Sequence, residues 1–192
     1  RCAGSGRPRS NLKTAMRTYE FTIVASGLHP EAEDLERRFY DAGCDDALVS
    51  FQKGHILVDF ARQATTLAEA LVSAVSDVRT AGAVVDRVEP DPLVSLSDMA
   101  QRASLTRQAM TNYFRGHRGE GFPAPKARIT TESPLWDWAD ASVWLYQQKR
   151  LSREAAVEAL VVSVANELIA RPDGDFGAAL DQRLRERLSA IA

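Results

Sequence analysis

The sequence has few of the features that mark secreted, membrane or metal-binding proteins. Only two cysteines, Cys2 and Cys44, occur in 192 residues, too few for a disulfide framework and without zinc-site spacing. No apolar run approaches the roughly 18 residues of a membrane span. No apolar segment of a secretory signal follows the basic first residues. These absences predict a protein of the reducing cytoplasm with no membrane contact.

Groups that could carry catalysis are also scarce. His29 and His55 have no metal-ligand spacing around them. Asp45 and Asp46 follow Cys44 and would raise the pKa of its thiol, which disfavours a nucleophile. The acidic residues within 31–36 are interpreted as a solvated helix face rather than a metal site. Without a nucleophile–base pair, a phosphate loop or a metal constellation, we expect no enzyme, no metal ion and no cofactor.

Charge is distributed unevenly along the chain, although the net charge is only −2. Residues 16–90 carry a net charge of −6, residues 95–150 one of +3 and residues 151–192 one of −2. Residues 1–15 contain four bases and no acid and are interpreted as a disordered arm or an upstream remnant, with a phosphate-contacting arm as the alternative. The pattern favours one segment that faces nucleic acid and one that faces a different partner.

Residues 16–90 alternate between strand and helix patterns. The predicted order is strand Tyr19–Ser26, helix Pro30–Ala42, strands Ala47–Gln52 and His55–Ala61 joined by a Lys53-Gly54 turn, helix Thr66–Thr80 and strand Ala83–Val88. This βαββαβ order predicts a ferredoxin-like domain within an α+β chain. A fold of this kind does not specify one function. We interpret the domain as a module for oligomerisation, protein contact or small-ligand sensing, and its acidity suits a protein partner.

Residues 95–116 have the pattern of two short helices joined by a tight turn. Ser95, with Asp98 three residues later, predicts a helix start close to a capping box. The apolar positions Leu96, Met99, Ala100 and Ala103 would then be buried. Ser104-Leu105 forms the turn, Thr106 begins the second helix and Gly116 ends it. This is a helix-turn-helix pattern.

The second helix, Thr106–Arg115, separates two kinds of side chain onto two faces. At roughly 100° per residue, one polar set falls within about 140° of arc. It consists of Arg107, Gln108, Thr111, Asn112 and Arg115. Ala109, Met110, Tyr113 and Phe114 form the face expected to be buried. A polar face with donors and no carboxylate suits the base edges and phosphates of DNA.

A wing is predicted after this helix. Phe122–Pro125 is stiff and extended, Lys126–Thr130 alternates as a strand with its bases on one face, and Leu135-Trp136 returns. Asp137 caps the next helix. An aromatic floor under the helix pair is expected from Trp136, Trp138, Val143 and Trp144.

The run from Ser97 to Leu145 resembles the winged helix-turn-helix modules of bacterial AlpA-type and MerR-like regulators and of phage excisionases. The resemblance depends on Ala100, Leu105, Thr106-Arg107-Gln108, Gly121-Phe122-Pro123-Ala124-Pro125, Leu135-Trp136 and Val143-Trp144-Leu145. Ser104 departs from it, since glycine is common at that turn. The resemblance implies a bacterial protein that binds double-stranded DNA, with the second helix in the major groove and the wing on the backbone or in the minor groove. It does not cover residues 16–90.

These observations define the predicted DNA-binding residues. Arg107, Gln108, Thr111 and Asn112 are candidates for base contacts, beside the cap Thr106. Arg115, His117, Arg118, Lys126 and Arg128 are candidates for phosphate or minor-groove contacts. The expected function is sequence-specific transcriptional regulation. Two alternatives are an antitoxin that binds a protein partner and represses its own operon, and an excisionase-like factor that bends DNA.

The C-terminal residues predict a helical hairpin, with helices Ser152–Ala170 and Asp175–Ile191 separated by Pro172-Asp173-Gly174. Their apolar stripes contain more area than a lone hairpin can bury. The stripes either form a homodimer, as a regulator of a repeated site requires, or pack on the other domains. The sequence leaves both alternatives open.

Overall fold

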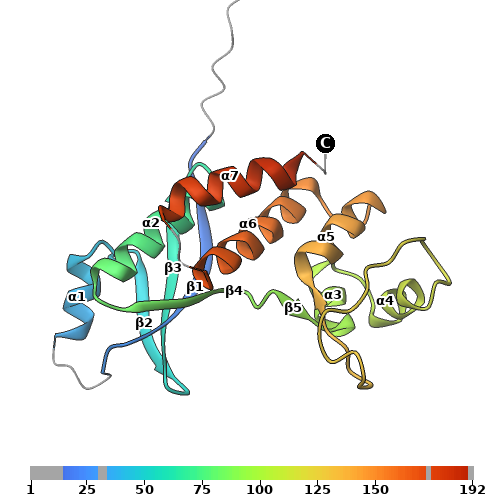
Figure 1. The fold of residues 1–192 in the computed structure, drawn as a ribbon, viewed down its shortest axis with the longest axis horizontal. Helices are drawn as coiled ribbons and strands as arrows, with labels where there is room; N and C mark the ends of the chain where they lie inside the picture. Colours follow the sequence, from blue (N-terminus) through green and yellow to red (C-terminus); the bar gives the residue numbers. More distant parts are fainter. Residues whose placement is uncertain (1–14, 30–33, 172–173, 190–192) are drawn as a thin grey trace, which may run out of the picture.

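The computed structural model describes residues 15–29, 34–171 and 174–189, which form a mixed α+β structure of seven helices, a four-stranded sheet and a two-stranded sheet (Figure 1). The predicted arm of residues 1–15 lies, except for Ala15, outside the described residues. Within them, no helix combines the length and apolarity needed to cross a bilayer.

The larger sheet is antiparallel, with the strand order β2-β3-β1-β4. Its strands and the two helices between them are β1 (Arg17–Ser26), α1 (Leu35–Asp41), β2 (Ala47–Gln52), β3 (His55–Ala64), α2 (Leu67–Thr80) and β4 (Val84–Glu89). The predicted strands and helices of residues 16–90 are therefore present, with ends that differ by at most five residues and with identical bounds for Ala47–Gln52. The start of the helix predicted from Pro30 lies outside the described residues.

Alternation of side chains places the core on one face of this sheet. Tyr19, Phe21 and Ile23 of β1 are buried, as period-two alternation predicts. They share one core with apolar side chains of α1 and α2, such as Phe39 and Leu71. The two helices therefore cover the same face of the sheet. The β2–β3 hairpin turns at Lys53 (φ 52°) and Gly54 (φ 82°), the pair of positive φ angles that a two-residue hairpin of type I′ needs.

The side chain of Arg62 links β3 to α2 and to the segment that follows α1. Arg62 is 7% exposed, and its guanidinium donates to both carboxylate oxygens of Asp46, at 2.9 and 2.8 Å, and to Asp77 Oδ2 at 2.6 Å. It also donates to the Gly43 carbonyl, just after α1, at 2.7 Å. Burial alone would lower the pKa of Arg62, but the hydrogen bonds and charges of Asp46 and Asp77 outweigh it and raise the pKa. Because the buried charge of Arg62 depends on both carboxylates, this network holds β3, α2 and the segment after α1 in one arrangement.

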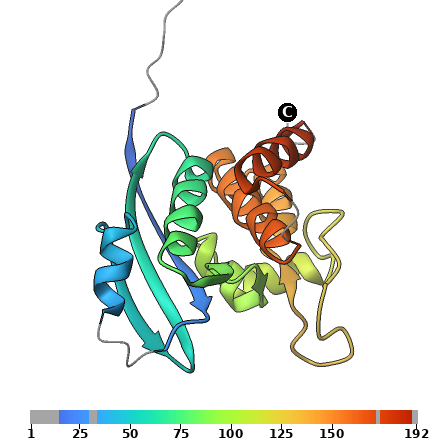
Figure 2. The same cartoon turned by 60° about the vertical axis from the view of Figure 1, so that its left-hand side comes forward.

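The two C-terminal helices, α6 (Arg153–Ile169) and α7 (Phe176–Leu188), pack against the rest of the chain. Val161, Val164 and Leu180 are buried in the same core as the sheet. In both views α6 and α7 lie beside α2 (Figures 1 and 2). The apolar stripes of the tail are thus covered within one chain, which is the packing alternative of the two predictions. Self-association through these helices stays a prediction.

Candidate nucleic-acid interface

The site begins at a well-capped helix, α3 (Leu96–Arg102). The Ser95 hydroxyl accepts from the Asp98 N–H at 3.3 Å, and Asp98 Oδ2 accepts from the Ser95 N–H at 2.8 Å. This is the reciprocal capping box that the sequence predicted. The hydrogen bonds from Ser95 to the carboxylate lower the pKa of Asp98. The start of α3 is therefore fixed by local groups before any tertiary contact is counted.

The turn after α3 depends on a left-handed residue. Ser104 adopts φ 53°, and the Leu105 N–H then donates to the Ala100 carbonyl at 2.8 Å. Only glycine adopts such angles without steric cost. The departure of Ser104 from the resembling family therefore falls on the residue where glycine would suit the backbone best.

Helix α4 (Arg107–Phe114) begins at Thr106, whose hydroxyl accepts from the Ala109 N–H at 3.1 Å. Its inner face is anchored by Met110 and Tyr113, which are 0% and 6% exposed. They share a core with the apolar side of α3 and with Trp136, Trp138 and Trp144. The predicted aromatic floor is therefore present, except that Val143 packs in a separate cluster against Leu160.

The polar face of α4 is directed away from this core. Thr106, Arg107 and Gln108 are exposed, and Thr111 and Asn112 are half-buried. Gln108 Nε2 donates to Asn112 Oδ1 at 3.1 Å, and the Thr111 hydroxyl donates to the Arg107 carbonyl at 2.9 Å. The two amides thus support each other along the helix, at the i, i+4 spacing of neighbouring side chains.

Further cations follow α4 in the chain. Arg115, His117 and Arg118 are exposed in the segment after the helix, and Lys126 and Arg128 are exposed beyond it. Lys126 Nζ lies 3.2 Å from Asp140 Oδ2, with both side chains about half exposed. No ion pair within the described ranges includes Arg107, Arg115, Arg118 or Arg128. The guanidinium groups of these four arginines, in α4 and in the segments that follow it, are therefore available to bind an external anion.

The predicted wing strand Lys126–Thr130 is wrong. Its only ladder contact is an isolated bridge between Ala127 and Leu135. Arg128 adopts φ 52°, and this left-handed angle ends the extended backbone after one residue. The segment is a loop closed by the Ala127–Leu135 bridge, so the bases do not lie on one strand face.

Aromatic contacts, rather than strand pairing, hold this loop to the helix pair. The Trp136 Nε1–H donates to the Pro123 carbonyl at 3.0 Å, and the Trp144 Nε1–H donates to the Glu120 carbonyl at 2.9 Å. The Phe122 ring meets Trp144 edge-on, with centroids 5.0 Å apart. Phe114 was predicted to be buried but is 44% exposed; its ring meets the Trp136 ring edge-on, with centroids 5.2 Å apart.

Gly119 is required for the close approach of the loop to Trp144. A Cβ at Gly119 would lie 2.8 Å from Trp144 Cζ2, and the residue has φ 68°. Gly121 has a similar φ of 70° but nothing within 4 Å of a Cβ position. Sequence reasoning missed this packing role, because no local pattern distinguishes the two glycines.

A two-stranded sheet that was not predicted joins the segment before α3 to the segment that leads into the next helix. β5 (Leu93–Val94) pairs with β6 (Trp136–Asp137), and the Trp138 N–H donates to the Pro92 carbonyl at 2.7 Å. Asp137 caps α5 (Trp138–Gln147) by accepting from the Ala139 N–H at 2.8 Å. Burial raises the pKa of Asp137. Residues before α3 and after the loop are thereby held together.

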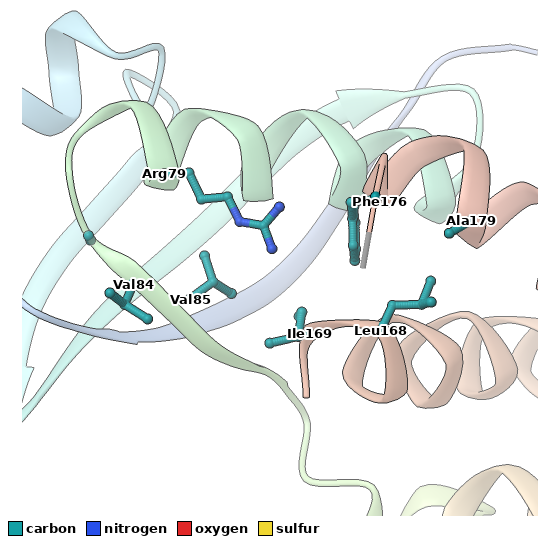
Figure 3. A pocket seen from close by; sticks show the side chains of 9 residues that line it. Arg79, Val84, Val85, Leu168, Ile169, Phe176 and Ala179 are labelled. Atoms are coloured by element: carbon teal, nitrogen blue, oxygen red, sulfur yellow. The ribbon is translucent and has the colours of Figure 1, made fainter. Parts of the chain in front are cut away.

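Two other features bear on catalytic chemistry. Burial, and then the charge of Asp77, raises the pKa of Cys44 to about 12, and the residue is 3% exposed, so Cys44 is a core residue whose environment disfavours the thiolate. A pocket of about 330 Å³ lies between β4, α2, α6 and α7. Arg79 and apolar side chains such as Phe176 line it (Figure 3). Among the described residues that line this pocket there is no acid, histidine, serine or cysteine.

No protein-family model, curated protein or solved structure matches this chain.

Proposed function

We propose that this chain is a sequence-specific double-stranded DNA-binding regulator, with α3 and α4 as a helix-turn-helix and residues 122–135 as a wing-like loop. In this proposal α4 enters the major groove and the loop lies on the backbone or in the minor groove. The sheet domain, with its strand order β2-β3-β1-β4, is assigned as a ferredoxin-like partner or effector module.

One observation carries the proposal: α4 is fixed on its apolar side and free on its donor side. Met110 and Tyr113 are buried in an aromatic core, whereas Arg107 and Gln108 are exposed. A guanidinium can donate two hydrogen bonds to guanine, and an amide side chain can pair with adenine. No acid lies within α4, so nothing on the helix repels phosphate.

The Gln108–Asn112 contact supports base reading in particular. A hydrogen bond between the two amides orients both groups before DNA binds, which reduces the entropy lost on binding. The cations of the loop supply salt-dependent affinity without sequence information. Lys126 can exchange Asp140 for a phosphate at small cost, because exposed ion pairs contribute only about 0–1 kcal/mol.

The test is selection of bound duplexes from a random library, followed by fluorescence titration of the selected and scrambled sequences. Arg107→Ala should reduce discrimination between the two by about 1–3 kcal/mol. Lys126→Ala should weaken both equally and lower the salt slope by about one. Arg183→Ala on α7, which also removes an exposed arginine, is the matched control and should change neither.

Equal behaviour of the Arg107 and Lys126 variants would count against the assignment of base and phosphate roles. Absence of duplex binding by the wild-type chain at low salt would reject the proposed function itself.

A further inference from the structure

Strand β2 is an edge of the larger sheet without the usual protection against pairing. The described part of the chain pairs β2 only with β3. Its sequence, ALVSFQ, contains no charge and no proline. Natural edge strands commonly carry a lysine, a proline or a bulge that prevents another strand from adding to them. The Ala47 N–H donates to the Cys44 carbonyl at 3.2 Å, and the rest of the outer side of β2 is open to strand addition.

Apolar side chains gather along this edge. Eight large apolar side chains are exposed among the described residues, and three of them belong to β2 or to the adjacent α1. They are Tyr40 (66% exposed), Leu48 (69%) and Phe51 (38%). An edge that exposes both backbone groups and apolar side chains is suited to a strand of similar composition.

The hairpin determines which backbone groups of β2 point outward. The two-residue turn makes Gln52 and His55 a hydrogen-bonded pair, and the Ala61 N–H donates to the Asp46 carbonyl at 3.0 Å. Even-numbered residues of β2 therefore direct their backbone groups to β3. Val49 and Phe51 direct theirs to the outside.

We propose that β2 pairs antiparallel with β2 of a second copy, about a two-fold axis through Val49. Such an axis, normal to the sheet, pairs only residues of the same face. Centring it on Val49 lets the two Val49 residues exchange hydrogen bonds and lets each Phe51 N–H donate to Ala47 of the second copy. Phe51 then packs over Ala47 on the core side, so the two cores become continuous.

Charge complementarity supports this register. Just beyond the ends of the paired strands, Asp45 of one copy faces Lys53 of the other. Both side chains are exposed, and no ion pair of the described residues includes either. Asp46 does not compete for Lys53, because Arg62 holds its two carboxylate oxygens. The symmetric contact therefore gains two opposite-charge pairs without bringing like charges together in the strands.

The location of the edge has a consequence that rests on the proposed function. β2 and α1 lie at one end of the long axis of the molecule, and α4 lies at the other (Figure 1). A dimer through β2 would place its two α4 helices at its far ends. It would thus hold two separated duplex sites rather than adjacent half-sites one helical turn apart.

Sedimentation equilibrium of the full chain over the micromolar range tests whether the chain dimerises through β2. We expect a dimer that Leu48→Lys weakens at least about tenfold, because it places like charges beside the two-fold axis. Ile129→Lys is the matched control, since Ile129 is 67% exposed and lies in the loop after α4. It should leave the dimer unchanged.

A charge exchange tests the register. Lys53→Glu should weaken the dimer about tenfold by turning two attractive pairs into repulsive ones, and the double variant Asp45→Lys/Lys53→Glu should restore it. A chain that stays monomeric throughout the micromolar range, or a dimer that neither Leu48→Lys nor Lys53→Glu weakens, would overturn the proposal. Binding of a single duplex site is measured separately, so its loss would reject the DNA-binding role and not this interface.

Discussion

The side chain of Asn166 on α6 pairs with the backbone of Val88 on β4 as a neighbouring strand would. Its Oδ1 accepts from the Val88 N–H at 2.7 Å, and its Nδ2 donates to the Val88 carbonyl at 2.9 Å. Val88 is 0% exposed, so these backbone groups have no access to water. One amide thus closes the edge of the sheet at β4, whereas the opposite edge, at β2, has no such partner among the described residues.

Replacement of Asn166 by alanine should destabilise the protein by roughly 2–3 kcal/mol, because it leaves a buried N–H and C=O without partners. Urea unfolding followed by circular dichroism measures this change. Asn112→Ala is the control: it removes one hydrogen bond from a surface helix and should cost less than about 1 kcal/mol. Similar losses in the two variants would contradict the strand-like role of Asn166.

Gly119 and Gly121 offer a matched pair for the packing of the loop on Trp144. Both substitutions to alanine introduce strain at positive φ, about 1 kcal/mol each. Gly119→Ala alone also forces Cβ against the Trp144 ring, and overpacking adds about 1–3 kcal/mol. We expect a lower melting temperature and altered tryptophan fluorescence for Gly119→Ala relative to Gly121→Ala. Indistinguishable variants would show that the loop can move away from the ring without cost.

Ser104→Gly should stabilise the protein by about 0.5–1 kcal/mol, because glycine adopts the left-handed angle of this turn without steric strain. The same substitution at Ser76, inside the right-handed helix α2, should instead destabilise by about 0.5 kcal/mol. Chemical denaturation of the two variants compares the two backbone conformations directly. Loss of stability at Ser104 would contradict the assignment of a strained turn.

The capping carboxylate Asp98 should make a pH-dependent contribution to stability. Its pKa is lowered in the folded chain by hydrogen bonds from Ser95, so its contribution is complete above the unfolded pKa of about 4. That contribution is lost as the pH falls through the lower folded pKa. Asp98→Asn should therefore cost about 0.5–1 kcal/mol at pH 7, and the difference from wild type should shrink below about pH 4.

Urea midpoints of both proteins across this pH range provide the measurement. Asp181→Asn on α7 removes an exposed carboxylate that takes part in none of the hydrogen bonds found among the described residues, and it serves as the control. A difference between wild type and Asp98→Asn that stays constant from pH 7 to acid would reject the carboxylate as the origin of the effect.

Local sequence was sufficient for the elements of residues 16–90 and, apart from Phe114, for the two faces of α4. Hydrophobic periodicity located the strands and helices of residues 16–90, because side-chain direction repeats every two or 3.6 residues whatever the surrounding fold. The caps at Ser95, Thr106 and Asp137 were predicted for the same reason, since a cap and its helix lie within four residues of each other. The sequence also shows that β2 contains no charge and no proline, but it does not show that β2 lies at the edge of the sheet.

Contacts between segments far apart in the sequence decided the features that local patterns did not predict. The wing strand failed because Arg128 adopts a left-handed angle and the loop is held by Trp136 and Trp144, an arrangement that alternation at residues 126–130 does not encode. The Asn166–Val88 pairing joins residues far apart in the sequence, and Gly119 differs from Gly121 only through the ring opposite it. The amino-acid sequence by itself determined which side chains share a face of each element, because backbone geometry is local. Only the tertiary structure decided which faces are covered, because burial depends on the segments that pack against them.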